Sequence, residues 1–260
     1  MRADMSRRFL RSACHAGVLL GLLLLALPGR AEAQGIGLTH LLEMMDWGRE
    51  TYVLAEVLEF APDGIDRPVR YDLLGWAGGA SNRIWAKADG EHGTQAGGGE
   101  TELQLLYGRL LTPWWDGQVG VKVDAHYGEG STSTRTSLAL GVQGLAPGWF
   151  EVEPTLFVSQ YGDVSASLEA SYDLLFTQRL VLAPRVELNA SARRVPEFGI
   201  GSGLSDLELG GRMRYELHRK FAPYIGVNWH RRLGGTADFA RDDGEPVSVT
   251  SLVAGVRTWY

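Results

Sequence analysis

The sequence predicts an all-β protein, a transmembrane, antiparallel, up-and-down β-barrel of about 12 strands, with about 10 as the alternative. Three observations predict this fold class. The chain begins like a secreted protein, it carries long runs in which apolar and polar residues alternate, and its last residue is aromatic. A length of 260 residues suits one such barrel and is short for two domains.

Residues 1–33 have the layout of a secretory signal peptide. Three arginines within residues 7–11 form a basic start, an apolar run covers residues 16–27, and the small residues Ala31 and Ala33 follow. The alternative is an N-terminal membrane anchor, but the apolar run has only about 12 residues and a helix needs about 20 to span a bilayer. We therefore expect cleavage after Ala33 and export to the cell outer membrane.

Cysteine content limits the chemistry of the mature chain, and its net charge limits the classes of partner. Cys14 is the only cysteine and lies in the segment to be removed, so we expect neither disulfides nor thiolate chemistry. Removing residues 1–33 leaves 20 Lys and Arg against 29 Asp and Glu, which changes the net charge from −6 to −9. This balance favours cations as partners and argues against nucleic acid.

Alternation with a period of two dominates the rest of the chain. Around residues 164–176, Val164, Ala166 and Leu168 share one face while Ser165 and Glu169 lie on the other. Similar runs occur at residues 118–126, 180–191, 206–218 and 221–232. They are about 10–14 residues long, against about 5–6 for ordinary strands and about 9–11 for strands that cross a membrane. The alternative, a periplasmic β-sandwich, fits these lengths less well. We therefore expect apolar faces toward lipid and polar faces toward a lumen.

The connections predict the strand count and orientation. Short turns are expected at residues 112–117, 146–148, 177–178 and 218–220, and longer loops at 90–99, 128–133, 194–203 and 233–245. Short turns and long loops alternate along the chain. The short turn Gly162-Asp163 is the exception, because this alternation predicts a long loop there. Counting back from Tyr260 gives ten strands from about Ser81, and Thr51–Phe60 and Val69–Trp76 add two more. The chain then divides into the signal peptide (1–33), a short periplasmic segment (34–50) and the barrel (51–260).

Aromatic residues near the predicted strand ends support the barrel. The pairs Trp114-Trp115, Trp149-Phe150 and Trp259-Tyr260 fall where interfacial girdles of membrane barrels lie. The last strand alternates up to Tyr260, and this ending resembles the C-terminal assembly signal of outer-membrane barrels.

Several stretches carry a resemblance to a known family. They include Phe221-Ala222-Pro223-Tyr224-Ile225-Gly226-Val227-Asn228-Trp229 and Tyr172-Asp173-Leu174-Leu175-Phe176-Thr177-Gln178-Arg179-Leu180. From about Tyr52 to Tyr260, the chain resembles the copper resistance protein B family. The resemblance implies an outer-membrane component of a copper-handling system. Its expected partners are copper ions, outer-membrane lipid and a periplasmic copper-handling protein, and copper would be bound or transported rather than catalytic.

A first candidate copper site lies before the barrel. Many members of the family carry a long Met- and His-rich segment there, whereas this chain has only residues 40–46. Copper(I) prefers thioether and imidazole ligands, and copper(II) prefers imidazole and oxygen. His40 and Met44 are four residues apart, so a helical turn would place them on one side, with Met45 adjacent. The alternative is a short amphipathic helix that rests on or plugs the barrel.

A second candidate site lies in the predicted lumen. Asp124 and His126 share the polar face of one strand, and His230 lies on the polar face of another. The alternative is a network of ion pairs that fills the lumen without binding metal. In that network four arginines pair with four acidic residues: Arg185, Arg212, Arg214 and Arg257 with Glu187, Asp206, Glu208 and Glu216.

These observations lead to one functional hypothesis and one alternative. The hypothesis is a barrel of copper resistance and homeostasis that binds or conducts copper ions through an acidic lumen. The alternative is a non-selective channel for small solutes, since both need a polar lumen. We do not expect an enzyme, because a barrel of the phospholipase type needs a lipid-facing Ser and His, and the strands that alternate clearly carry no outward-facing His.

Overall fold

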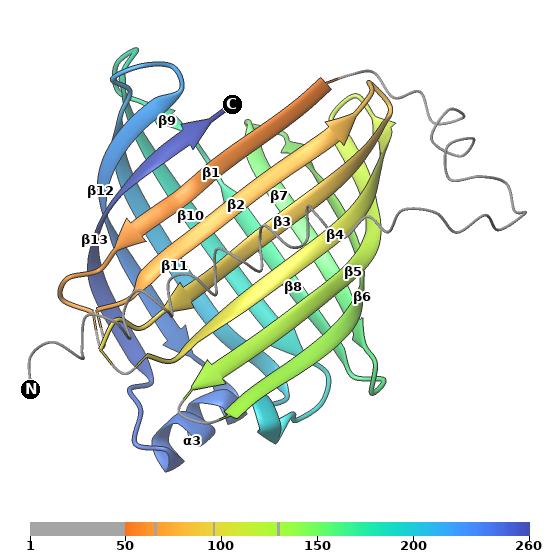
Figure 1. Ribbon diagram of the computed structural model, residues 1–260, viewed down its shortest axis with the longest axis vertical. Helices are drawn as coiled ribbons and strands as arrows, with labels where there is room; N and C mark the ends of the chain where they lie inside the picture. Colours follow the sequence, from red (N-terminus) through yellow and green to blue (C-terminus); the bar gives the residue numbers. More distant parts are fainter. Residues whose placement is uncertain (1–49, 65–66, 96, 129–130) are drawn as a thin grey trace, which may run out of the picture. The chain divides into compact units, whose positions relative to one another are not determined.

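The computed structural model describes residues 50–260, except 65–66, 96 and 129–130 (Figure 1). The predicted signal peptide (1–33) and nearly all of the predicted periplasmic segment (34–50) lie outside the described residues, so both stay predictions. Within the described ranges, no helix is long and apolar enough to cross a membrane.

The described residues form one antiparallel sheet that closes into a barrel (Figure 1). Strands that follow one another in the chain pair side by side, and β13 pairs with β1 to close the ring. Backbone hydrogen bonds between Tyr260 and Val53, of 2.8 and 2.9 Å, complete this seam. The strands are β1 (Glu50–Phe60), β2 (Val69–Gly78), β3 (Asn82–His92), β4 (Gly99–Thr112), β5 (Trp115–Gly128), β6 (Ser131–Ala146), β7 (Phe150–Ser159), β8 (Val164–Ser171), β9 (Leu174–Leu175), β10 (Leu180–Ser191), β11 (Gly203–Tyr215), β12 (Phe221–Arg232) and β13 (Ser248–Trp259).

These strands occupy twelve positions around the barrel. The short β9 pairs with the same strand, β10, as β8 does, so β8 and β9 are two parts of one interrupted strand. The predicted barrel of about 12 strands is therefore confirmed, and the alternative of about 10 is wrong. The two segments that decided between these counts form β1 and β2, which pair with each other over ten residue pairs.

The connections differ in length between the two ends of the barrel. At the end that carries the C-terminus, they are short, such as residues 113–114 and 147–149. At the opposite end they include residues 192–202 and 233–247 (Figure 1). The expected long loop at residues 128–133 is wrong, because β5 ends at Gly128 and β6 begins at Ser131. The short turn around Gly162-Asp163 joins β7 to β8.

The outer face of the barrel is apolar. Leu105, Ile225 and Leu252 are 56%, 68% and 58% exposed, which is unusual for such side chains unless lipid or another apolar surface covers them. At the short-turn end, aromatic side chains such as Trp114 and Trp149 are exposed and lie edge to face with ring centroids 6.0 Å apart. The apolar outer face agrees with the predicted alternation, and its contact with lipid stays a prediction.

Part of the inner face is apolar as well, which the alternation rule does not anticipate. Trp85, Leu106, Ala139 and Phe157 are buried together inside the barrel. Trp76 connects them to Tyr52, whose ring also lies 5.9 Å from that of Trp259. Trp259 therefore belongs to this inner aromatic cluster and not to the outer girdle, because it alternates with the outward-facing residues of β13. Small barrels fill their interior with such side chains.

Two helical elements lie at the long-loop end. The α-helix α3 (Gly234–Asp242) occupies most of the loop between β12 and β13, and a 3-10 helix, η1 (Pro196–Phe198), lies in the loop between β10 and β11. The loops contact each other where the backbone N–H of Gly201 donates a 2.9 Å hydrogen bond to Oγ1 of Thr236. This contact fixes α3 at the mouth of the barrel (Figure 1).

Candidate functional site in the barrel lumen

The lumen contains a cavity of about 960 Å³. Inward-facing side chains of the strands line it, together with Phe198 of η1 and Thr236 and Phe239 of α3 at the long-loop end. Among the described residues that line the cavity, fifteen are Asp or Glu and only six are Lys or Arg. A cavity with walls of one predominant charge concentrates counter-ions, so this lumen attracts cations.

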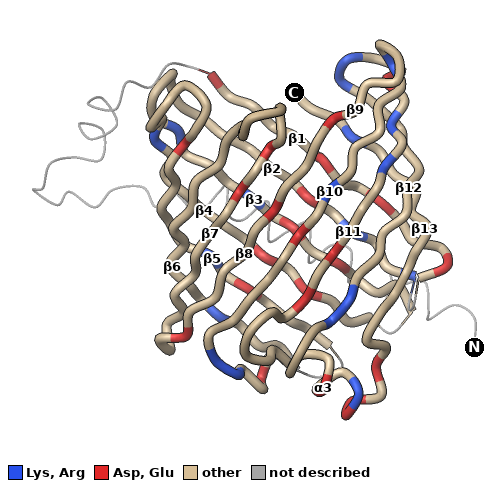
Figure 2. Tube along the Cα trace, turned by 180° about the vertical axis from the view of Figure 1, so that it is seen from behind, with Lys and Arg blue, Asp and Glu red and all other residues tan. Residues whose placement is uncertain are grey.

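Acidic residues recur at positions along neighbouring strands of the barrel wall (Figure 2). In the first carboxylate row, each residue lies directly opposite the next in the strand pairing, from β2 through β3 and β4 to β5. Its members are Asp72, Asp89, Glu102 and Asp124. Directly opposed residues have Cβ atoms about 4.5–5.5 Å apart, so four carboxyl groups follow one another along one side of the lumen.

The second carboxylate row lies on another part of the wall, from β7 through β8 and β10 to β11. Its members are Glu153, Glu169, Glu187 and Glu208. His230 of β12 lies opposite Glu208 and extends this row by one imidazole. Like charges directly opposite each other destabilise a sheet, so both rows are arrangements that sheet stability alone does not favour.

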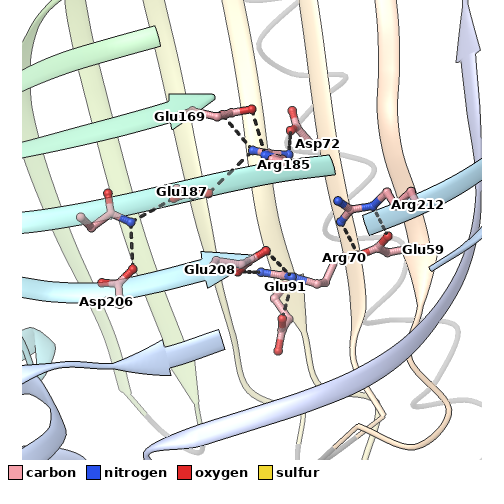
Figure 3. Close-up of polar contacts among 11 residues, drawn as sticks. Glu59, Arg70, Asp72, Glu91, Glu169, Arg185, Glu187, Asp206, Glu208 and Arg212 are labelled. Atoms are coloured by element: carbon pink, nitrogen blue, oxygen red, sulfur yellow. Dashed lines mark hydrogen bonds and ion pairs between the residues drawn. The ribbon is translucent and has the colours of Figure 1, made fainter. Parts of the chain in front are cut away.

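Cations from other strands partly neutralise the rows by reaching across the lumen. Arg70 of β2 forms a bidentate pair with Glu208 of β11, with distances of 2.9 and 2.8 Å, and its Nε lies 2.9 Å from Glu91 (Figure 3). Lys87 of β3 pairs with Glu153 of β7. Because β2 is not a neighbour of β11, nor β3 of β7, these pairs cross the interior and connect distant parts of the wall.

Arg185 of β10 makes the most extensive of these contacts (Figure 3). Its Nη1 lies 2.9 Å from Asp72, its Nε and Nη2 each lie 2.9 Å from an oxygen of Glu169, and Nη2 is 3.7 Å from Glu187. Asp72 belongs to the first row, and Glu169 and Glu187 belong to the second. Arg185 is therefore bound to both rows at once.

The first row is neutralised less completely than the second. Lys122 contacts both Glu102, at 2.5 Å, and Asp124, at 3.0 Å. Asp89, between Asp72 and Glu102, makes no hydrogen bond or ion pair within the part of the chain that the structure describes. The row therefore keeps one carboxyl group without a partner in the middle of the lumen wall.

A separate buried pair lies outside the cavity and has a structural role. Glu59 of β1 accepts two hydrogen bonds of 3.0 Å from Arg212 of β11 and one of 3.1 Å from the hydroxyl of Tyr224. The Glu59 side chain is fully buried, and every bond to it is charge-assisted. The sequence predicts acidic partners for Arg212 among residues 187–216, whereas its partner is Glu59, at the other end of the barrel sequence.

The candidate lumen ligands predicted from the sequence all line the cavity, but in different places. Asp124 is held by Lys122. The Nδ1 atom of His126 lies 3.7 Å from Glu100, and its ring packs edge to face on Phe198 with centroids 5.2 Å apart. His230 lies on β12, away from β5, the strand that carries the other two. Binding of metal by these residues stays a prediction.

No compact metal site is present among the described residues, where no group of three or more His, Cys, Asp or Glu side chains has a suitable arrangement. His40, Met44 and Met45 lie outside these residues, so the N-terminal site also stays a prediction. The lumen therefore offers many single donors along its wall and no closed coordination sphere.

One histidine on the outer face lies outside the strands that the alternation predicts, because β3 extends to His92 into the expected loop at residues 90–99. His92 alternates with the lumen residue Glu91 and thus lies on the outer face of β3, where it stacks on Tyr127 with ring centroids 5.9 Å apart. Its Nδ1 atom is 3.4 Å from the Tyr127 hydroxyl. This contact is with a tyrosine and not with the serine that a lipid hydrolase would need.

Sequence reasoning missed the features that depend on register. Alternation places acidic residues on the inner face but does not say which of them are opposed across strands. The rows, and the pairs of Arg70 and Lys87 across the lumen, appear only when the strand pairing is known. The signal available in the sequence was the recurrence of acidic residues at inward positions of consecutive strands.

The closed sheet, the apolar outer face and the charged lumen together define an outer-membrane-type β-barrel. A solved porin structure, NanC, has the same fold: the similarity covers 80% of this chain and 99% of the porin, with a TM-score of 0.50 and 12% sequence identity. At this identity the likeness concerns the fold alone.

Sequence comparison identifies the family. The family model described as copper resistance protein B precursor (CopB) matches residues 49–260. A copper resistance protein B homolog of Pseudomonas syringae pv. tomato is 39% identical over 84% of this chain and 72% of its own length. The copper resistance protein B of Escherichia coli is 41% identical over 80% of this chain and 69% of its own length. The chain belongs to the copper resistance protein B family.

Proposed function

We propose that this protein serves copper resistance as an outer-membrane barrel that binds or conducts copper ions through its acidic lumen. The observation that carries the proposal is the pair of carboxylate rows, in which eight acidic residues are opposed in two runs of four. Local arrangements that oppose stability are expected at functional sites, where another requirement maintains them. Attraction of a cation is the requirement that fits carboxylates.

The donors in the lumen suit copper(II) better than copper(I). The described residues that line the cavity include carboxylates and the imidazoles of His126 and His230, and none of them is Met or Cys. Oxygen and imidazole donors match copper(II), whereas copper(I) prefers sulfur. The proposed cargo of the described barrel is therefore copper(II).

The dispersed donors also fit passage of the ion along the lumen. Conduction requires that an ion bind well enough to enter and weakly enough to leave, which several weak sites in sequence achieve better than one tight site. The rows provide such a series, and the apolar outer face supports a position of the barrel in outer-membrane lipid. A periplasmic copper-handling protein is the proposed partner at the short-turn end.

The non-selective channel remains the rival function, and the structure offers a reason to rank it second. Ion pairs between Arg185 and Asp72 and between Arg70 and Glu208 cross the lumen. An open pore for small solutes would need this space free. Selective interaction with a small cation does not need a wide opening.

The experiment that tests the proposal combines survival with metal binding. Deleting the gene should lower copper tolerance, and the wild-type gene should restore it. A variant that weakens both rows, Asp89→Asn with Glu187→Gln, should bind copper(II) about tenfold more weakly and restore tolerance poorly, because it removes two carboxyl donors from the cavity. The matched control is Asp238→Asn with Arg241→Gln, an exposed pair on α3 with side chains 67% and 60% exposed.

Two results would contradict the proposal. If deletion changes neither copper tolerance nor cell-associated copper, the copper function is wrong. If the purified barrel conducts copper(II) and unrelated cations equally and has no measurable affinity for copper(II), the non-selective channel is the better account.

A further inference from the structure

Among the described cationic side chains that line the lumen, Arg185 contacts the largest number of carboxylates. Its guanidinium binds Asp72 on one side and Glu169 and Glu187 on the other, at 2.9 to 3.7 Å. β2 and β10, which carry Asp72 and Arg185, are not neighbours in the sheet, so this contact spans the interior (Figure 3). A cation that binds between Asp72 and Glu169 therefore competes with the guanidinium of Arg185.

The other lumen cations do not share this position. Arg70 uses its fork on Glu208 of the second row and its Nε on Glu91, which belongs to neither row. Lys122 contacts only the first row, and Lys87 contacts only the second. Among the described residues, Arg185 is therefore the one cation bound to both rows.

We propose that Arg185 is the resident counter-ion of the lumen and determines its selectivity for divalent over monovalent cations, an inference that rests on the proposed copper function. The guanidinium is permanently charged, and because it is tethered it is present at a high effective concentration. A potassium or sodium ion offers the carboxylates no more charge than Arg185 does and has no tether, so it does not displace the guanidinium. A copper(II) ion carries twice the charge and forms coordinate bonds with carboxylate oxygens, so it can.

The arrangement also provides a position for the displaced side chain. Arg185 holds Glu187 at 3.7 Å, a longer contact than its other ion pairs, and both residues lie on the inner face of β10. When Asp72 and Glu169 bind a divalent ion, the long and flexible arginine side chain can keep Glu187 as its partner. The lumen then exchanges one bound cation for another and is not left with uncompensated carboxylates.

The test compares Arg185→Gln with the matched control Arg70→Gln. Each variant removes one guanidinium, and with it one positive charge, from the same lumen. Only Arg185→Gln removes the contact that connects the two rows. Copper(II) affinity of the purified protein is measured by titration, and potassium leakage is measured after the protein is placed in liposomes. Arg185→Gln should bind copper(II) about tenfold more tightly, because no guanidinium has to be displaced, and it should leak potassium. Arg70→Gln should show smaller changes in both.

The outcomes separate this inference from the proposed function. If wild-type protein neither binds nor passes copper(II), the proposed function fails. If wild-type protein handles copper(II) but Arg185→Gln gains neither affinity nor potassium leakage, or if Arg70→Gln gains as much, the role of Arg185 is overturned. Heat-modifiable electrophoretic mobility reports whether each variant folds. If Arg185→Gln does not fold, Arg185→Lys keeps the charge without the fork and should still exclude potassium, and leakage by that variant would equally overturn the inference.

Discussion

The two carboxylate rows have the same length and chemistry but differ in how their charge is balanced. Every member of the second row has a cationic partner: Glu153 has Lys87, Glu208 has Arg70, and Glu169 and Glu187 share Arg185. In the first row, Asp89 has none among the described residues, and one lysine serves two carboxylates.

This difference suggests a division of roles. Two partners of the second row, Arg70 and Lys87, come from across the lumen, and the third, Arg185, connects the row to Asp72 on β2. The ion pairs of this row therefore hold distant strands at fixed positions and act as structure. The first row keeps one carboxyl group, that of Asp89, which no described cation contacts, so this row has a donor available to an incoming cation. Substitutions in the second row should therefore affect stability most, and substitutions in the first row should affect cation binding most.

The largest expected effect on stability is from Glu208→Gln in the second row. The change leaves the Arg70 guanidinium without its bidentate partner in the lumen. Breaking a fully buried pair costs about 3–5 kcal/mol, but Arg70 and Glu208 keep 27% and 17% of their side-chain exposure, so we expect a loss of roughly 2 kcal/mol in the free energy of unfolding. Urea unfolding in lipid vesicles measures it. The exposed Asp238→Asn change should cost less than about 0.5 kcal/mol, and an equal loss in both would remove the structural role of the second row.

Asp89→Asn in the first row should have the opposite sign. Asp89 lies directly opposite both Asp72 and Glu102, so neutralising it removes like-charge repulsion without leaving a cation unpaired. We expect a gain of roughly 0.5 kcal/mol in the free energy of unfolding, together with weaker copper(II) binding. The same unfolding assay and a copper(II) titration check the two parts. If the variant loses stability, or binds copper(II) as tightly as the wild type, Asp89 does not have the role of an unpaired carboxyl group that binds the incoming cation.

The fold could be predicted from the sequence because its signals are local. Alternation along residues such as Val164 to Ser171 depends only on which side of a strand meets lipid, and the aromatic residues mark strand ends. The two departures from the predicted strand boundaries are local as well. β6 extends back to Ser131 and shortens an expected loop, and the residues between Ser171 and Leu174 interrupt a strand whose alternation looks continuous. The inner aromatic cluster around Trp85 and Trp259 breaks the polar-inside rule because part of a narrow lumen is filled with side chains.

The candidate site could be predicted only in part, because it depends on register and on contacts between distant strands. Asp124, His126 and His230 were placed in the lumen by alternation alone, and all three line the cavity. The pairing of Glu59 with Arg212, 153 residues apart, depends on how the barrel closes between β1 and β13. The bridging role of Arg185 similarly requires knowledge of which strand lies across the lumen, which no local pattern contains.

The two lumen histidines offer a finer test of the same comparison. His126 lies two residues from Asp124 of the first row and near the exposed Glu100, whereas His230 lies opposite Glu208, which Arg70 already holds. His126→Gln should therefore weaken copper(II) binding by about threefold, which is roughly 0.7 kcal/mol, and His230→Gln should weaken it less. Titration of both variants beside the wild type measures the difference. A larger loss for His230→Gln would transfer the cation-binding role to the second row.

The smallest effect on the described lumen is expected from the N-terminal candidates His40, Met44 and Met45. Thioether sulfur prefers copper(I), whereas the lumen presents oxygen and imidazole donors. Replacing all three residues with Ala should leave copper(II) binding unchanged and should lower only the copper retained under reducing conditions. Mass spectrometry of the metal content, with the protein loaded under oxidising and under reducing conditions, separates the two. If the triple variant loses its copper(II), then the N-terminal segment and not the first carboxylate row is the main contact for this ion, because the variant leaves every lumen carboxylate in place.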